Sequence, residues 1–186
     1  MIRLHLQGSG EASLPAVYDA LLAREVDPPM VATLDADALH VELHPAAEPI
    51  RIARTDEGLF SLDANTVTAG PGYHRHVVTL AESLDVTWDR GGDDTGWRES
   101  RDDDALEEMF LDWLGAAAAQ ILEWVDQGGV GFALAMPAGH RYEHRGVVAT
   151  QLGPRDLGWL EATRAEARAG TDLFPWWEAE RDARYY

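Results

Sequence analysis

DDDALEEMFLDWLGAAAAQILEWVDQ, residues 102–127, is the longest stretch of the chain with one clear periodicity. Its apolar side chains recur at steps of three and four residues, which places them on one side of an α-helix. They are Leu106, Phe110, Trp113, Ala117, Ile121 and Trp124. A second row beside them (Leu114, Ala118, Ile121, Val125) makes the apolar stripe wider than a surface helix needs. We therefore predict a long central helix that contacts more than one neighbour.

The ends of this helix are marked by ordinary signals. Asp102, Asp103 and Asp104 can cap its first turn, where carboxylates interact favourably with the helix dipole. Gly128 and Gly129 end it. An acidic metal site shared with the following glutamates is the alternative, and the capped helix start is the favoured interpretation.

The rest of the chain alternates strand-like runs with turn residues. Alternation such as Leu39-x-Val41-x-Leu43 predicts strands with one buried and one solvated face. We expect strands near 1–6, 30–34, 38–44, 50–54, 59–67, 86–89, 130–136 and 147–152, and further helices near 14–24, 71–84, 153–169 and 174–186. The prediction is a single α+β domain over residues 1–186, with a mostly antiparallel sheet of roughly six to eight strands packed by helices around the long central helix. Because the last helix still runs at the final residue, the chain is either part of a longer protein or ends in a frayed turn.

Composition excludes several classes of chemistry. The chain has 186 residues, 15 basic against 33 acidic ones, and a net charge of -18. Such a charge repels phosphate backbones, so we expect no nucleic-acid binding and favour a basic protein partner. There is no cysteine, and all basic residues are arginine, which removes thiol and lysine nucleophiles. We expect no cofactor.

The sequence shows no targeting or membrane segment. No apolar run approaches the ~18 residues of a membrane span. The first residues, MIRLHLQGSGEAS, have one positive charge and no long apolar region, so they lack the features of a secretory signal. We expect a cytoplasmic protein.

Pairs of histidines suggest metal sites, but their predicted positions do not suit coordination of one metal ion. His140-Arg-Tyr-Glu-His144 matches the H-x-x-E-H pattern of inverted zinc proteases. That chemistry needs a helix, and here the pattern falls on a predicted hairpin turn between residues 130–136 and 147–152. His74 and His76 diverge on a helix, although His74, near a helix start, suits an acid–base role. We predict no metal site from these spacings.

Tryptophans at predicted element edges are the most suggestive candidates for a binding surface. The chain has 7 tryptophans. Trp97 with Arg98, and the adjacent Trp176 and Trp177, lie where aromatic residues often contact partners. Asp94, His74 and His76 complete the set of candidate binding residues around the loop at 90–101.

Three functions fit these features. The preferred hypothesis is a non-enzymatic acidic interaction domain that binds a protein partner. The second is a metal-assisted hydrolase or other small-molecule enzyme, with a site built from His74, His76, Asp94 and Arg98. The third is an acidic mimic of nucleic acid, which requires carboxylates spaced like phosphates along one face.

Four short segments resemble uncharacterised bacterial proteins. They are GPGYH at 70–74, DDTGWRESRD at 93–102, QLGPRDLGWL at 151–160 and DLFPWW at 172–177. The resemblance implies a bacterial, cytoplasmic origin. It assigns no activity and no catalytic residue.

Overall fold

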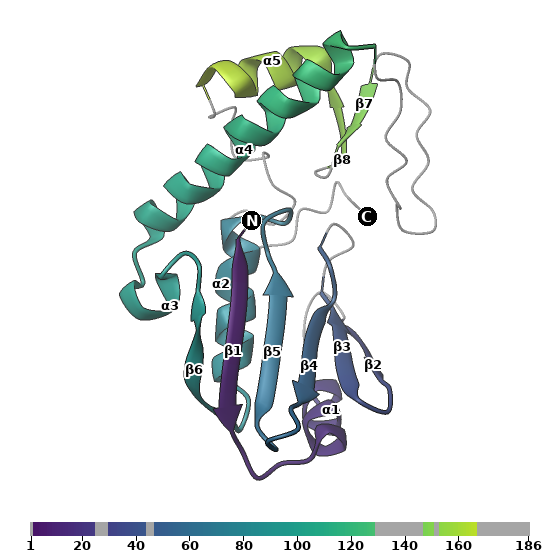
Figure 1. Cartoon of the computed structure of the whole chain (residues 1–186), viewed down its shortest axis with the longest axis vertical. Helices are drawn as coiled ribbons and strands as arrows, with labels where there is room; N and C mark the ends of the chain where they lie inside the picture. Colours follow the sequence, from purple (N-terminus) through teal and green to yellow (C-terminus); the bar gives the residue numbers. More distant parts are fainter. Residues whose placement is uncertain (1, 25–29, 44–46, 129–146, 151–152, 167–186) are drawn as a thin grey trace.

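Six antiparallel strands form the main sheet of the computed structural model, which describes residues 2–24, 30–43, 47–128, 147–150 and 153–166 (Figure 1). Across the sheet the strands follow the order β2-β3-β4-β5-β1-β6. Their bounds are β1 Arg3–Ser9, β2 Val31–Leu34, β3 Ala38–Glu42, β4 Ile50–Arg54, β5 Phe60–Asn65 and β6 Thr87–Asp93. The predicted α+β class with a mostly antiparallel sheet is confirmed.

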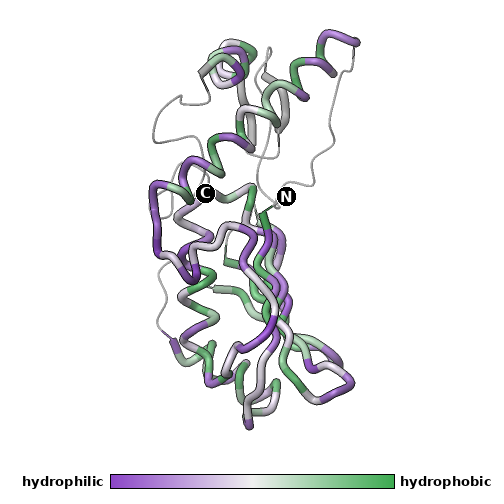
Figure 2. The backbone as a smooth tube through the Cα atoms, turned by 60° about the vertical axis from the view of Figure 1, so that its left-hand side comes forward, coloured by the Kyte–Doolittle hydropathy of each residue, from purple (hydrophilic) through white to green (hydrophobic). Residues whose placement is uncertain are grey.

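Helices α1 (Leu14–Leu22) and α2 (Pro71–Glu82) cover one face of this sheet (Figures 1 and 2). Strand β1 shows the reason, because its Leu4 and Leu6 are buried while the intervening His5 is exposed. Burial of the shared apolar face holds the helices on the sheet. The opposite face carries one row of polar residues aligned across four strands: His5, Asp63, Arg51 and His40.

Helix α4 (Asp103–Asp126) confirms the long helix predicted over 102–127. Asp102 caps it as expected, since its carboxylate accepts the Ala105 amide at 3.0 Å. The fully buried side chains of α4 are spaced four residues apart: Leu106, Phe110, Leu114, Ala118 and Leu122. The first three belong to the main core, and the last two form a smaller cluster with Leu160 of α5 (Leu157–Glu166). Helix α4 therefore joins the sheet to a second packing unit at its far end (Figure 1).

The buried row of α4 differs from the predicted one. Trp113 is half-buried, and Trp124 is 44% exposed, so the prediction that Trp124 belongs to the core is wrong. Adjacent rows on a helix are about 100° apart, and periodicity alone fits both. The position of α5 over Ala118 and Leu122 decides which row is covered.

The C-terminal described elements correct a second prediction. Strand β7 (Val147–Thr150) pairs with β8 (Gly153–Asp156), whereas 153–156 was predicted to open a helix. The residue before a proline avoids helical backbone, and the Asp156 carboxylate caps α5 by accepting the Trp159 amide at 2.7 Å. The predicted strand at 130–136, the H-x-x-E-H pattern and the predicted helix at 174–186 lie outside the described residues.

Strand β6 extends to Asp93, into the segment predicted as a loop, and the short helix α3 (Trp97–Ser100) follows it. Glycine allows the extension, because β6 approaches β1 very closely. At Gly91 a Cβ would lie 2.1 Å from the His5 carbonyl oxygen, and its φ of +92° suits glycine alone. The glycines that predicted a loop therefore permit a tightly paired edge strand.

Candidate functional site

His74 and Asp93 form a buried polar pair at the junction of α2 and β6. Both side chains are 0% exposed, and His74 Nε2 lies 3.1 Å from the Asp93 carboxylate. His74 Nδ1 contacts the hydroxyl of Thr66 at 2.8 Å, on the turn between β5 and α2. His74 was predicted from the sequence as a site residue, whereas Asp93 and Thr66 were not. An Asp-x-Thr step at 93–95, typical of side chain-to-backbone turns, was the available signal.

The Asp93 carboxylate also organises the segment that leads into α3. Oδ1 accepts the amide and the hydroxyl of Thr95, both at 2.8 Å, and Oδ2 accepts the amide of Arg98 at 2.9 Å. An ionised carboxylate only accepts hydrogen bonds, so His74 Nε2 carries the proton that it shares with Asp93. The pair thus ties α2, β6 and α3 together.

Opposing effects act on the pKa of Asp93. Burial raises it, but the hydrogen bond and charge of His74, with the amides of Arg98 and Thr95, lower it by more. The net pKa lies well below the ordinary value of a carboxyl, so Asp93 stays ionised at neutral pH. Because neither side chain is exposed, the pair is closed to a substrate in this conformation, and its hydrogen bonds connect α2, β6 and α3.

Trp97 is buried rather than presented to solvent. The residue is 8% exposed, its Nε1–H donates to Asp103 at 2.8 Å, and the Arg101 guanidinium lies 4.5 Å from the ring centre. Arg75 contacts the same Asp103 carboxylate at 3.2 Å. Trp97 therefore links α3 to the start of α4, beside Arg75 of α2. The sequence predicted a binding role for Trp97 from its position at an element edge, and it did not reveal this buried contact.

The side chains of the other predicted site residues make separate contacts. Arg98 donates from Nη2 to the Trp88 carbonyl at 2.9 Å, and Asp94 accepts the Arg3 amide at 2.9 Å. His76 is half-buried, and burial lowers its pKa. Trp176 and Trp177 lie outside the described residues. Within the part of the chain that the structure describes, no three potential metal-ligating side chains converge.

An acidic row lies along the first half of α4: Asp104, Glu108 and Asp112, all exposed. Each is two residues before a member of the buried row, so the acidic row lies about 200° around the helix from the core side. Helix α4 contains no basic residue. Among the described residues no ion pair involves these three carboxylates, whereas the neighbouring Asp103 and Glu107 face Arg75. The spacing of these acidic residues, four positions apart, can be seen in the sequence.

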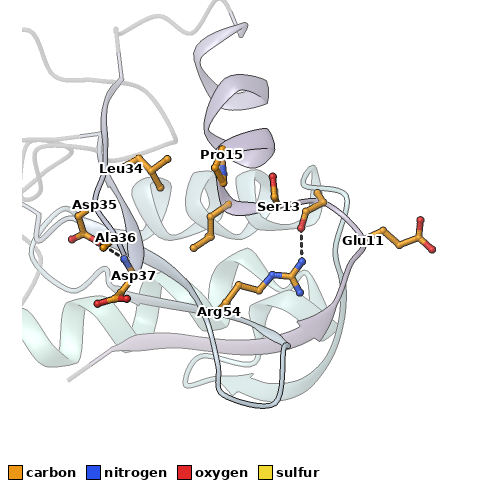
Figure 3. Close-up of a pocket in the computed structure, with 10 residues that line it drawn as sticks. Glu11, Ser13, Pro15, Leu34, Asp35, Ala36, Asp37 and Arg54 are labelled. Atoms are coloured by element: carbon orange, nitrogen blue, oxygen red, sulfur yellow. Dashed lines mark hydrogen bonds between the residues drawn. The ribbon is translucent and has the colours of Figure 1, made fainter.

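A hollow of about 490 Å³ lies between the start of α1 and the turn that joins β2 to β3 (Figure 3). Leu14, Pro15 and Leu34 supply its apolar wall. Arg54 lies along its floor, where it donates to the carbonyls of Gly10 and Ala12 and stacks 3.9 Å from the Phe60 ring centre.

The rim of this hollow is acidic. Asp35 and Asp37 occupy the β2–β3 turn, and Asp35 Oδ1 accepts the amides of Asp37 and Ala38 at 2.9 and 2.7 Å. These hydrogen bonds lower the pKa of Asp35, which keeps it negatively charged. Glu11 also lines the hollow, but its side chain extends away from it (Figure 3).

Comparisons of the chain with family models, curated proteins and solved structures give no match. None of the described helices is long and apolar enough to cross a membrane.

Proposed function

We propose that the chain is a non-enzymatic acidic interaction domain that binds a basic protein partner through the acidic row of α4. The observation that carries the proposal is that three neighbouring carboxylates have no cationic partner among the described residues. Asp104, Glu108 and Asp112 are exposed, four residues apart, and without an ion-pair partner in the described residues. Like charges at this spacing repel each other on a helix, and a cationic partner would relieve that repulsion.

The overall charge supports the same partner chemistry. A chain with net charge -18 attracts cationic surfaces over distances near the Debye length, about 8 Å at physiological salt, and accelerates their encounter. The packing of α4 supports it as well, because Leu106, Phe110 and Leu114 hold this half of the helix on the main core. The row is therefore presented on a fixed element, which lowers the entropic cost of binding.

A nucleic-acid mimic would need a longer row of carboxylates. The spacing of four residues gives a charge every ~6 Å along the axis, but the row stops at Asp112 because the next turn is Gly115–Ala119. A protein partner with a compact basic patch suits three charges better.

The test compares two triple variants of equal charge in affinity capture from an extract of the producing cells. Asp104→Asn with Glu108→Gln and Asp112→Asn removes the row. The control, Asp56→Asn with Asp85→Asn and Asp89→Asn, removes three exposed carboxylates elsewhere.

We expect affinity capture to recover one partner protein with the wild type and with the control variant. The variant that lacks the acidic row of α4 should not recover it. We also expect the captured partner to be released by raised salt. Equal loss from both variants would show that only diffuse charge matters. Both that outcome and repeated capture of no partner would overturn the proposal. Circular dichroism checks that the variants are folded. The free energy of unfolding of the variant without the acidic row should lie within about 1 kcal/mol of the wild-type value, because neutral residues replace mutually repelling ones.

A further inference from the structure

Strand β2 leaves one edge of the main sheet open. It is the terminal strand of the sheet, and among the described residues only β3 pairs with it. The Asp35 amide donates to the Ala38 carbonyl at 2.9 Å, which fixes the alternation of hydrogen-bonded pairs in this hairpin. It follows that the amide and carbonyl of Thr33 face β3, whereas those of Ala32 and Leu34 face outward.

The two edges of the sheet are built differently. Strand β6, at the other edge, carries Asp89 and Arg90, and a bulge interrupts its pairing with β1. Charges and bulges are devices by which proteins keep edge strands from pairing with other chains. Strand β2 has the sequence VATL, with no charge, no proline and no glycine. Its outer edge has none of these protections.

Apolar side chains surround this unprotected edge. Val31 is 56% exposed and Leu34 is 36% exposed, and Leu22 at the end of the neighbouring α1 is 50% exposed. These are three of the six exposed large hydrophobic residues of the described chain. The apolar wall of the hollow continues from Leu34. A strand added to β2 would therefore find both backbone partners and side-chain contacts.

The charges around β2 favour a positively charged strand as the one that pairs with its open edge. The β2–β3 hairpin, residues 31–42, contains Asp35, Asp37 and Glu42 and no arginine. Its one histidine, His40, contacts the Asp35 carboxylate at 3.2 Å, which leaves Asp37 and Glu42 without an ion pair among the described residues. Arg54, which lines the hollow, already donates to backbone carbonyls. A second copy of this chain would bring like charges to the edge and a further -18 of net charge. A cationic segment would meet an attractive field.

We propose that the outer edge of β2 binds an extended peptide segment that carries arginine or lysine, by adding it as a further antiparallel or parallel strand. The amides and carbonyls of Ala32 and Leu34 supply the backbone hydrogen bonds, in the manner of other sheets extended by a peptide. Asp37 and Glu42, together with the Asp35 carboxylate, supply the preference for basic side chains. This surface is separate from the acidic row of α4, and the proposal stands without it.

The probe is a fluorescent six-residue peptide of alternating threonine and valine with an arginine at each end. A matched peptide has glutamate in place of both arginines. Fluorescence anisotropy at low salt measures the dissociation constant of each with the full chain. We expect the arginine peptide to bind at least about tenfold more tightly than the glutamate peptide, and this preference to shrink at high salt.

Ala32→Pro is the decisive variant. Proline removes an outward amide and places its ring in the path of an added strand, while the inward hydrogen bonds to β3 remain. We expect it to weaken binding of the arginine peptide at least about tenfold. Ala32→Val keeps the amide and a β-compatible side chain, so it should bind within about twofold of the wild type.

Amide hydrogen exchange of the wild type gives a second measurement, which decides the matter if Ala32→Pro does not fold. Saturating arginine peptide should protect the amides of Ala32 and Leu34 from exchange. The proposal is overturned by unchanged binding to Ala32→Pro, by no binding of the arginine peptide, or by protection of these amides through self-association without peptide. If peptide binding is lost only in the triple variant of the α4 row, the peptide sits on α4. The β2 proposal then fails while the proposed function survives.

Discussion

Replacing Asp93 by asparagine tests whether the buried pair with His74 stabilises the fold. The carboxylate accepts hydrogen bonds from four groups: His74 Nε2, the Thr95 amide, the Thr95 hydroxyl and the Arg98 amide. An asparagine side chain keeps one acceptor oxygen and presents an NH2 group to the donors around the other position. At least one backbone amide is then buried without an acceptor.

The magnitude follows from this count. Each buried polar group left unsatisfied costs roughly 1–3 kcal/mol. With one or two such groups, Asp93→Asn should lower the free energy of unfolding by about 2–4 kcal/mol. For a chain of 186 residues this corresponds to a fall in Tm of roughly 5–15 °C. Asp89→Asn on the exposed side of β6 is the control and should change stability by less than about 0.5 kcal/mol.

The pH dependence gives an independent check with a defined sign. The folded-state pKa of Asp93 is lowered, so the unfolded chain binds the proton more readily. The stabilisation by Asp93 is therefore complete above the unfolded pKa, about 4, and is lost as the pH falls towards the lower folded value. The stability difference between wild type and Asp93→Asn should shrink as the pH falls below about 4.

Urea unfolding followed by tryptophan fluorescence at several pH values measures both quantities. A cost below about 0.5 kcal/mol at pH 7 would refute the structural role of the pair. A difference that grows as the pH falls below about 4 would contradict the assigned direction of the pKa shift of Asp93.

Three further predictions test the architecture, each by urea unfolding of single variants. Phe110→Ala, at a fully buried position of α4, should lower the free energy of unfolding by about 3–5 kcal/mol. Trp124→Ala, at a position 44% exposed, should lower it clearly less, and equal costs would contradict the exposed position of Trp124. Gly91→Ala should destabilise by more than about 2 kcal/mol, because its Cβ would strike a carbonyl and its φ is positive. Gly92→Ala has open space at the Cβ and should change stability by less than about 1 kcal/mol; similar costs would refute the close approach of β6 and β1. Trp97→Phe keeps most of the buried ring but loses the indole hydrogen bond to α4, and should cost about 1 kcal/mol; no cost would show that this bond does not hold the start of the helix.

Periodicity and turn residues were sufficient for most of the main sheet. The strand at 50–54 matches its prediction, and the other strands of the sheet lie within a few residues of theirs, except β6, because alternation along a strand reflects which face is buried. The same local logic predicted α1, α2 and α4. It failed at Gly153–Asp156 and at β6, where pairing with another strand overrode the turn signals of proline and glycine.

The candidate site could be predicted only in part. His74, Trp97 and Arg98 were selected and do lie around the junction of α2, β6 and α3, but burial gives His74 and Trp97 a structural role that residue type does not show. The edge of β2 could not be identified beforehand, because strand order depends on pairing between distant segments.

The sequence by itself determined the acidity, the absence of cysteine and lysine, the helix at 103–126 and the antiparallel hairpins, since each depends on composition or on neighbours along the chain. Only the tertiary structure decided that Asp93 meets His74, that the α4 carboxylates lack cationic partners among the described residues, and that β2 rather than β6 is the unprotected edge. These properties depend on which surfaces remain uncovered after folding, and coverage is set by contacts between residues far apart in the chain.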